Sequence, residues 1–375
     1  MTNDERRLAA LLDVIDALGP LDAASMAEAT ATLDGLTKPP GSLGVLESLV
    51  TQLAGISGTP RPTFPRRAIV VAAADHGVVR RGVSAYPASV TGQMVANFLA
   101  GGAAINVLAA AVDAEVTVID VGVASPIPAS ATMGGGPVDG RSATLIRAPV
   151  RSGTDDMTVR AAMSRTDALR AIAVGLDVVE SLAGLGVDLI AVGEMGIGNT
   201  TAASAIVSAL TGLPPERVTG RGTGIDDPTH ARKLETISRA LDRHRPDPAD
   251  PIGVLAAVGG LEIAALVGVL LGAVAARRPV VLDGFITGAA ALIAVGLAPD
   301  AGPRLIAGHR SSEPGHAIVL ERLGGRPLLE LDLRLGEGTG AAMAIGLIDA
   351  AVTLRDGMAT FGSAGVSGPV ERVRP

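Results

Sequence analysis

A carboxylate between glycines stands near the C-terminal end of the sequence, in Arg334-Leu-Gly-Glu-Gly-Thr-Gly340. Glycine on both sides of Glu337 removes side-chain bulk and lets the acid face a ligand. An acid in the first turn of the apolar helix that follows is also favoured electrostatically, by about 0.3–1 kcal/mol. That effect lowers a carboxylate pKa by less than about one unit, whereas deep burial raises it by up to about 3–5 units. A buried Glu337 is therefore predicted to act as a base, and an exposed one as a helix cap.

Two glycine- or serine-containing turns could hold an anion, because each precedes a predicted helix whose first N–H groups are free. The first, Gly193-Glu-Met-Gly-Ile-Gly-Asn-Thr200, lacks both the Lys-Ser/Thr ending of a Walker loop and the dinucleotide spacing G-x-G-x-x-G. The second is Arg310-Ser-Ser-Glu-Pro314. For the first turn, the alternative is that Glu194 faces solvent. For the second, simple helix capping explains Ser311 or Ser312 equally well.

A third glycine-rich stretch, Gly220-Arg-Gly-Thr-Gly-Ile-Asp-Asp-Pro228, leads into a helix predicted to run to about His244. Lys233, in its second turn, could hold a phosphate or carboxylate as a point charge, or could be a solvated helix lysine.

A polar loop follows the first predicted strand, in Ala74-Asp-His-Gly77 and then residues 82–93. Tyr86, the single tyrosine of the chain, could cover an aromatic base, and Gln93 could hydrogen-bond one. Packing of Tyr86 against the protein is the alternative.

Short β-branched runs alternate with helical patterns, and the predicted strands are residues 68–72, 116–120, 187–192, 279–282 and 303–306. Continuously apolar strands separated by helices indicate an α/β fold with a mainly parallel, Rossmann-like sheet covered on both faces. Ligands of such sheets bind beyond the carboxyl ends of the strands. The polar turns there are expected to form the site, and they are Asp75-His76-Gly77, residues 193–196, Asp283-Gly284 and residues 308–312.

Helices are predicted near both chain ends, over about residues 8–18, 23–36, 43–56 and 341–354. The segment 124–153, rich in Gly, Pro, Ser and Ala, is expected to be a surface excursion or a lid, and the tail from Asp356 to be partly disordered. The apolar stretch 261–276 contains Glu262 and is shorter than the about 20 residues that span a membrane, which predicts a buried helix.

Composition excludes several function classes. The net charge of −7 without a basic cluster argues against nucleic-acid binding. The chain has no Cys, and its five His lack metal-ligand spacing, so neither a disulfide nor a metal site is expected. The first residues do not resemble a signal peptide, and a cytoplasmic location is expected.

Six motifs together resemble the nicotinate-nucleotide:dimethylbenzimidazole phosphoribosyltransferases, in the same order and over about residues 36–354. They are Leu36-Thr-Lys-Pro-Pro-Gly-Ser-Leu-Gly44, Ala74-Asp-His-Gly-Val78, residues 193–200, residues 220–227, Ala307-Gly-His-Arg-Ser-Ser312 and Leu335-Gly-Glu-Gly-Thr-Gly-Ala341. The resemblance implies a three-layer α/β domain over residues 61–340. It also implies a smaller helical domain built from residues 1–60 and part of the C-terminal region, where 341–375 form the C-terminal helix and tail. The expected assembly is a homodimer. The same resemblance implies transfer of phosphoribose from nicotinate mononucleotide to a benzimidazole without a cofactor, in cobalamin biosynthesis.

The resemblance also implies roles for individual residues. The general base falls on Glu337, a second active-site carboxylate on Glu194, and the active-site lysine on Lys233. The substrate-binding positions are Gly196, Gly222, Ser311 and Arg334 for phosphate, Leu335 near the base pocket, and Tyr86 and Gln93 beside the benzimidazole.

Two other functions are compatible with parts of the sequence. Asp226-Asp227 is similar to the acidic pair with which diphosphate-using phosphoribosyltransferases bind ribose and magnesium, although no apolar strand runs directly into it. A non-catalytic nucleotide-binding regulator, in which Glu337 only caps a helix, would also use the glycine loops.

Overall fold

The structure is a computed structural model that describes residues 1–127 and 142–368. Part of the expected lid, residues 128–141, and the end of the expected tail, residues 369–375, lie outside the described residues.

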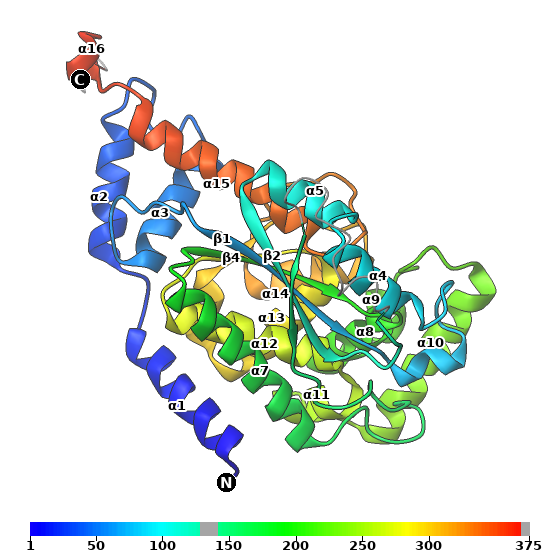
Figure 1. Ribbon diagram of the computed structural model, residues 1–375. Helices are drawn as coiled ribbons and strands as arrows, with labels where there is room; N and C mark the ends of the chain where they lie inside the picture. The colour runs from blue at the N-terminus through cyan, green and yellow to red at the C-terminus, as the bar shows by residue number, and fades with distance from the viewer. Residues whose placement is uncertain (128–141, 369–375) are drawn as a thin grey trace, which may run out of the picture.

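Six parallel strands form a single sheet in the order β3-β2-β1-β4-β5-β6 (Figure 1). The strands are β1 (Arg67–Ala74), β2 (Ala114–Gly122), β3 (Thr144–Arg147), β4 (Leu189–Met195), β5 (Val280–Leu282) and β6 (Leu305–Ala307). The predicted parallel α/β sheet is thus confirmed. The interpretation of residues 124–153 as an excursion or lid was wrong for Thr144–Arg147, which pairs with β2 as an edge strand.

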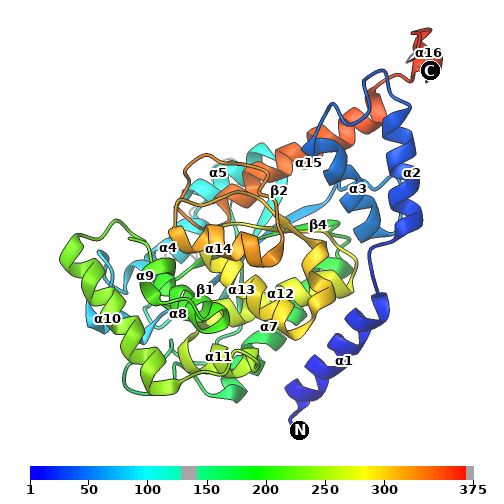
Figure 2. The same ribbon diagram turned by 180° about the vertical axis from the view of Figure 1, so that it is seen from behind.

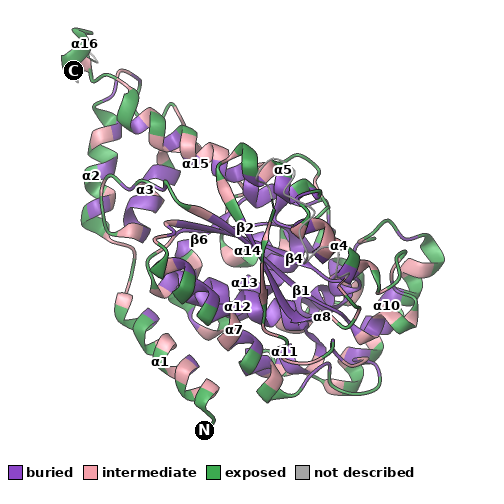
Figure 3. Cartoon of the chain, viewed as in Figure 1, coloured by how far each residue is buried: buried purple, intermediate pink, exposed green. Residues whose placement is uncertain are grey.

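Helices cover both faces of the sheet because the buried strands present apolar side chains alternately to each side. In β1, Ala68, Val70 and Ala72 belong to one apolar cluster, whereas Ile69 and Val71 belong to the other. Figure 3 shows this buried interior between helices whose outer faces are exposed.

The first cluster includes α1 (Asn3–Leu18), α7 (Arg165–Gly184), α8 (Asn199–Thr211), α10 (Asp227–His244), α11 (Pro251–Val258), α12 (Leu261–Ala275), α13 (Phe285–Leu297) and α14 (Pro314–Leu323). The second includes α2 (Ala23–Asp34), α3 (Val45–Ser57), α4 (Val90–Leu99), α5 (Ala104–Ala111) and α15 (Thr339–Gly357). Short helices are η1 (Gly77–Arg81), α9 (Pro215–Val218), η2 (Pro299–Arg304) and α16 (Phe361–Ala364).

The N-terminal helices divide between the two faces. Helix α2 packs on α3, which packs on α15, so segments near the two ends of the sequence lie together there (Figure 1). Helix α1 instead contacts α7 and α12 through Leu8 and Ile15, on the other side of the molecule (Figure 2). We therefore propose a smaller helical domain that rests on α2, α3 and α15, with α1 attached to the larger domain.

One apolar stretch among the described residues, Val90–Ala111, is long and apolar enough to cross a membrane, with a mean hydropathy of 1.7. The chain divides this stretch into α4 and α5 at Gly101-Gly102, and Phe98 and Ile105 are completely buried in the protein core. The stretch predicted to be a buried helix at 261–276 is α12, whose Glu262 is itself fully buried.

Candidate active site

A pocket of about 530 Å³ lies where the carboxyl ends of β1, β4, β5 and β6 meet. The strand order reverses between β1 and β4, which is where doubly wound sheets bind their ligands. Eight of the ten residues predicted for the site line this pocket, and they are Tyr86, Glu194, Gly196, Gly222, Ser311, Arg334, Leu335 and Glu337. Segments more than 250 residues apart in the chain therefore converge at one site, from Tyr86 to Glu337.

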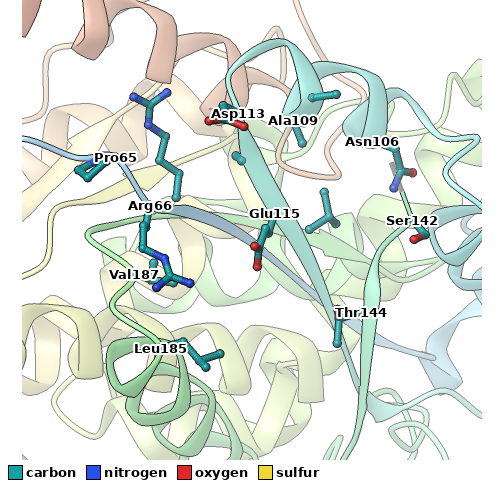
Figure 4. A pocket seen from close by; sticks show the side chains of 14 residues that line it. Pro65, Arg66, Asn106, Ala109, Asp113, Glu115, Ser142, Thr144, Leu185 and Val187 are labelled. Carbon is teal, nitrogen blue, oxygen red and sulfur yellow. The ribbon is translucent and has the colours of Figure 1, made fainter. Parts of the chain in front are cut away.

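A second hollow of about 590 Å³ lies at the opposite ends of the strands, beside the start of β2 (Figure 4). Of its charged side chains, Arg66, Asp113 and Glu115 are exposed to solvent, and the partly buried Arg67 is already paired with Asp349. Exposed charges interact weakly with any partner because water screens them, and this edge is not where parallel sheets bind ligands. The candidate active site is therefore the pocket at the carboxyl ends.

Glu337 is one of three buried carboxylates that line this pocket, with Glu194 and Glu313, and 6% of its surface is exposed. It lies in the left-handed region with φ of 63°, between Gly336 at 84° and Gly338 at 89°. Burial raises the pKa of Glu337 to about 7, against a hydrogen bond from the Ile105 N–H that lowers it, and the nearby Asp283 carboxylate raises it further. Glu337 is thus buried, and for a buried Glu337 the sequence predicts a base and not a solvated helix cap.

Glu194 is the penultimate residue of β4 and is as buried as Glu337. Burial raises its pKa well above the usual value, and the carboxylates of Asp283, Glu262 and Glu337 add to this effect, while a hydrogen bond from the Asn199 side chain lowers the pKa. Like charges that share a dry site cannot all ionise. Glu194 therefore tends to keep its proton.

The anion-binding turns lie on neighbouring sides of the pocket. Gly196 and Asn199 precede or begin α8, and Ser311 lies three residues before α14. Arg334 reaches the loop of residues 220–224 and donates to the Gly222 carbonyl at 3.4 Å. These turns bring two helix N-termini, a hydroxyl and a guanidinium to one place, which suits a phosphate. The N–H groups of Gly222 and Ser311 themselves donate within the protein, to Glu313 and His316.

Lys233 is placed behind the pocket rather than in its lining. The side chain is 1% exposed and its Nζ donates to Thr200 Oγ1 at 2.9 Å and to the Gly220 carbonyl at 3.4 Å. Burial lowers the pKa of Lys233 to about 8, although the Glu313 carboxylate opposes the shift. The alternative of a solvated helix lysine is therefore wrong, and Lys233 supports the walls formed by Thr200 and Gly222.

The benzimidazole side of the expected site is only partly assembled. Tyr86 and Leu335 stand at the pocket with 52% and 58% of their surfaces exposed. Gln93 is exposed on α4 and lies outside the lining, whereas Val90 and Met94, one helical turn apart, face the pocket. The structure thus gives no support to contact between Gln93 and a base.

Asp226 and Asp227 lie outside the pocket, at the exposed start of α10. Asp226 accepts a hydrogen bond from the Thr229 N–H at 3.0 Å as the helix cap, and Asp227 pairs with Arg221. Both carboxylates therefore have structural partners away from the site. Within residues 1–127 and 142–368, no group of three or more His, Cys, Asp or Glu side chains could hold a metal ion.

A family profile described as "Phosphoribosyltransferase" matches residues 18–366. The nicotinate-nucleotide–dimethylbenzimidazole phosphoribosyltransferase of Roseiflexus sp. strain RS-1 is 55% identical over 361 residues, which are 96% of this chain and 99% of that protein. The chain belongs to this phosphoribosyltransferase family. A relative of the same name from Salinispora tropica is 52% identical over 359 residues, covering 94% and 97% of the two chains. The crystal structure of the Thermus thermophilus enzyme of this name superposes with a TM-score of 0.84 at 47% identity, covering 93% of this chain and all of the other.

Behind the lining of the phosphoribosyltransferase site lies a buried pair, His76 and Glu262, for which the sequence predicts only a turn residue and an acid in a helix. His76, after β1, lies 2.7 Å from Glu262 at the start of α12 through Nε2 and Oε1. Burial lowers the pKa of His76, but the Glu262 carboxylate and Asp75 raise it more. The ring packs under Gly196, where an added β-carbon would lie 3.3 Å from it. The pair therefore supports the first anion-binding turn from below.

Proposed function

We propose that this enzyme transfers the phosphoribosyl group of nicotinate mononucleotide to 5,6-dimethylbenzimidazole. The products are nicotinate and α-ribazole 5′-phosphate, the lower-ligand precursor of cobalamin. The observation that carries the proposal is Glu337, a carboxylate buried in a pocket of about 530 Å³ with a pKa of about 7. A base works best when its pKa lies near the operating pH.

The chemistry needs one base. Nicotinate leaves from a pyridinium-type N-glycosidic bond with the bonding electron pair, so it departs without a proton. One benzimidazole nitrogen attacks the ribose C1′ from the opposite face, which inverts the configuration to α. The other ring nitrogen becomes acidic as the new bond forms, and the Glu337 carboxylate takes its proton across a hydrogen bond of about 2.6–3.2 Å.

In this proposal Glu194 acts as a neutral hydrogen-bond donor and not as a negative charge. Because its pKa is raised well above the usual range by burial and three nearby carboxylates, its neutral form is favoured. A neutral carboxyl donates a hydrogen bond, and we assign that bond to the ribose or to the departing nicotinate carboxylate. The two acids would then divide the work, with Glu337 accepting a proton and Glu194 donating a hydrogen bond.

The phosphate of the donor is assigned to the turns of Gly196, Gly222 and Ser311, with Arg334 as the cation. Helices α8 and α14 start beside these turns, and their N-terminal N–H groups favour an anion. Lys233 stabilises the same wall through Thr200 and the Gly220 carbonyl. Tyr86 and Leu335 are assigned to the benzimidazole, at the exposed mouth of the pocket.

The central test measures nicotinate release from nicotinate mononucleotide with a panel of benzimidazoles, purines and phenols. Glu337→Gln keeps the shape of the side chain and removes the base, so turnover should fall by about 10²–10⁴-fold while donor binding persists. Donor binding is measured by calorimetry, and Glu235→Gln on the exposed side of α10 serves as the matched control. Unchanged turnover in Glu337→Gln would contradict the base assignment.

The same assay separates this function from a magnesium-dependent transfer. Activity should survive EDTA and require nicotinate mononucleotide rather than phosphoribosyl diphosphate. Asp226→Asn should leave turnover unchanged, because asparagine also caps a helix. Loss of activity in EDTA, or in Asp226→Asn, would favour the magnesium-dependent reaction.

We also propose that the enzyme is a homodimer, as the family resemblance implies, and that it is located in the cytoplasm. The absence of Cys is compatible with a reducing compartment. Light scattering coupled to gel filtration tests the dimer, and a single-chain mass would contradict it.

A further inference from the structure

Asp283 lies directly beyond β5, and only 1% of its surface is exposed. Its carboxylate accepts three backbone hydrogen bonds from the start of α15. Oδ1 accepts from Gly340 at 2.7 Å and from Ala341 at 3.1 Å, and Oδ2 accepts from Gly338 at 3.3 Å. Asp283 is outside the pocket lining, so it can act on a substrate only through these neighbours.

The residue that these bonds hold in place is Glu337. Three successive residues, Gly336, Glu337 and Gly338, have positive φ, and only glycine adopts that conformation readily. An L side chain stays there only when the surroundings determine the backbone from several sides. The N–H groups that donate to Asp283 begin with that of Gly338, the residue after Glu337, and continue into the first turn of α15.

His309 closes the other side of this arrangement. Its Nε2 lies 3.4 Å from Asp283 Oδ1, and its ring packs so closely on Gly340 that a side chain there would collide with it. The His309 ring in turn packs edge-on against His316, whose Nδ1 accepts from the Ser311 N–H at 2.9 Å. The start of α15 is therefore held between the ends of β5 and β6.

We propose that Asp283 is a positioning residue of the transfer reaction, which ties α15 to β5 and so fixes the Glu337 carboxylate at the pocket. This inference rests on the proposed function of Glu337 as the base. Asp283 also places a negative charge near Glu337. Other charged or titratable groups near the turn are Glu194 from β4, His309 from beyond β6, and Arg334, three residues before Glu337.

Asp283→Asn tests both contributions, since asparagine keeps the shape but loses the charge and one acceptor. We expect kcat to fall by roughly 10²-fold, the effect of misplacing a reacting group by about 1 Å, while KM for nicotinate mononucleotide changes little. The acid limb of kcat against pH should move to lower pH, because a nearby negative charge raises the pKa of Glu337. A merely structural role would lower the melting temperature without moving that limb.

Asp283→Glu separates position from charge. It keeps the carboxylate but displaces it by one methylene, so turnover should fall while the acid limb stays near its original pH. This variant also keeps the inference testable if Asp283→Asn does not fold.

The matched control is Asp75→Asn. Asp75 is another buried carboxylate beyond a strand, and its Oδ2 accepts from the Ala124 and Ser125 N–H groups at 2.8 and 3.1 Å, outside the pocket lining. Asp75→Asn should leave the acid limb in place whatever its effect on stability. An equal displacement in this control would overturn the inference.

The remaining outcomes separate the two proposals. If Glu337→Gln loses activity but Asp283→Asn keeps the original kcat and acid limb, the positioning role is overturned and the base assignment stands. If Glu337→Gln turns over at the original rate, both are overturned.

Discussion

Gly193 lies directly against the main chain of Glu337. A β-carbon added to Gly193 would overlap the carbonyl group of Glu337 and the nitrogen of Gly338. The end of β4 and the turn before α15 can approach this closely only because position 193 has no side chain. Two of the carboxylates of the pocket, Glu194 in β4 and Glu337 in the turn, therefore face a common space.

Gly193→Ala should push the turn away from β4. Because the obstacle is backbone, it cannot rotate aside, and overpacking of this kind destabilises a protein by about 1–3 kcal/mol. We expect a lower kcat together with a lower free energy of unfolding, measured by nicotinate release and urea denaturation. Gly184→Ala, at the end of α7 with open space around it, is the control and should be neutral or slightly stabilising. Equal behaviour of the two variants would show that the close contact is unimportant.

The rate should depend on pH through Glu337. Its pKa is raised to about 7, so the carboxyl is protonated below that pH and cannot accept the benzimidazole proton. We expect kcat/KM to rise about tenfold per pH unit below pH 7 and to level off above it, since this ratio reports groups of the free enzyme. An acid limb near the ordinary carboxylate pKa of about 4.3, or none between pH 5 and 8, would contradict the assignment.

Lys233 should make stability depend on pH in the alkaline range. Its pKa is about 8 in the folded protein and 10.5 when unperturbed, so between these values the unfolded chain holds a proton that the folded chain lacks. Stability therefore rises with pH over this window, by up to about 3 kcal/mol. Lys233→Met should remove most of that rise. Urea denaturation of both proteins at pH 8 and pH 10 measures this change in the free energy of unfolding. The same change with pH in both proteins would refute the prediction.

Substitutions at the mouth of the pocket should change KM for the benzimidazole more than KM for nicotinate mononucleotide. Tyr86→Ala and Leu335→Ala remove half-exposed apolar contacts, so we expect KM for the benzimidazole to rise by roughly 5–10-fold, equivalent to about 1 kcal/mol. KM for nicotinate mononucleotide should change little. Gln93→Ala, on the exposed side of α4, should behave like the original protein. A rise in the benzimidazole KM for Gln93→Ala would return that residue to the site.

The sequence predicted the central strands well because they are continuously apolar and flanked by polar turns. It did not predict β3, since Thr144–Arg147 is a short edge strand with partly exposed side chains and lacks that signal. Helices α4 and α5 were not predicted either. The first turn of α4 falls within the stretch 82–93, whose polar and small residues instead predict a loop.

The site residues show the same division. Motif residues that line the pocket could be found from their glycine-rich turns, Glu194 and Gly196 at the end of a strand and Glu337 ahead of an apolar helix. The burial of Lys233 could not, because one lysine in an amphipathic helix has no sequence signal for the side it faces. The partners of Asp283 are equally hidden, since its three hydrogen bonds are to backbone N–H groups between 55 and 58 residues away.

The location of Glu337 at the start of α15 also has a consequence for synthesis. Helix α15 is the last long helix of the described chain, and it packs on β4, β5, α3 and α5. A ribosome therefore completes the strands, the anion-binding turns and Lys233 before the base and the helix that covers one face of the sheet. A nascent or prematurely terminated chain could fold much of its first apolar cluster, yet it would lack the base, and part of its second cluster would remain exposed to chaperones and proteases.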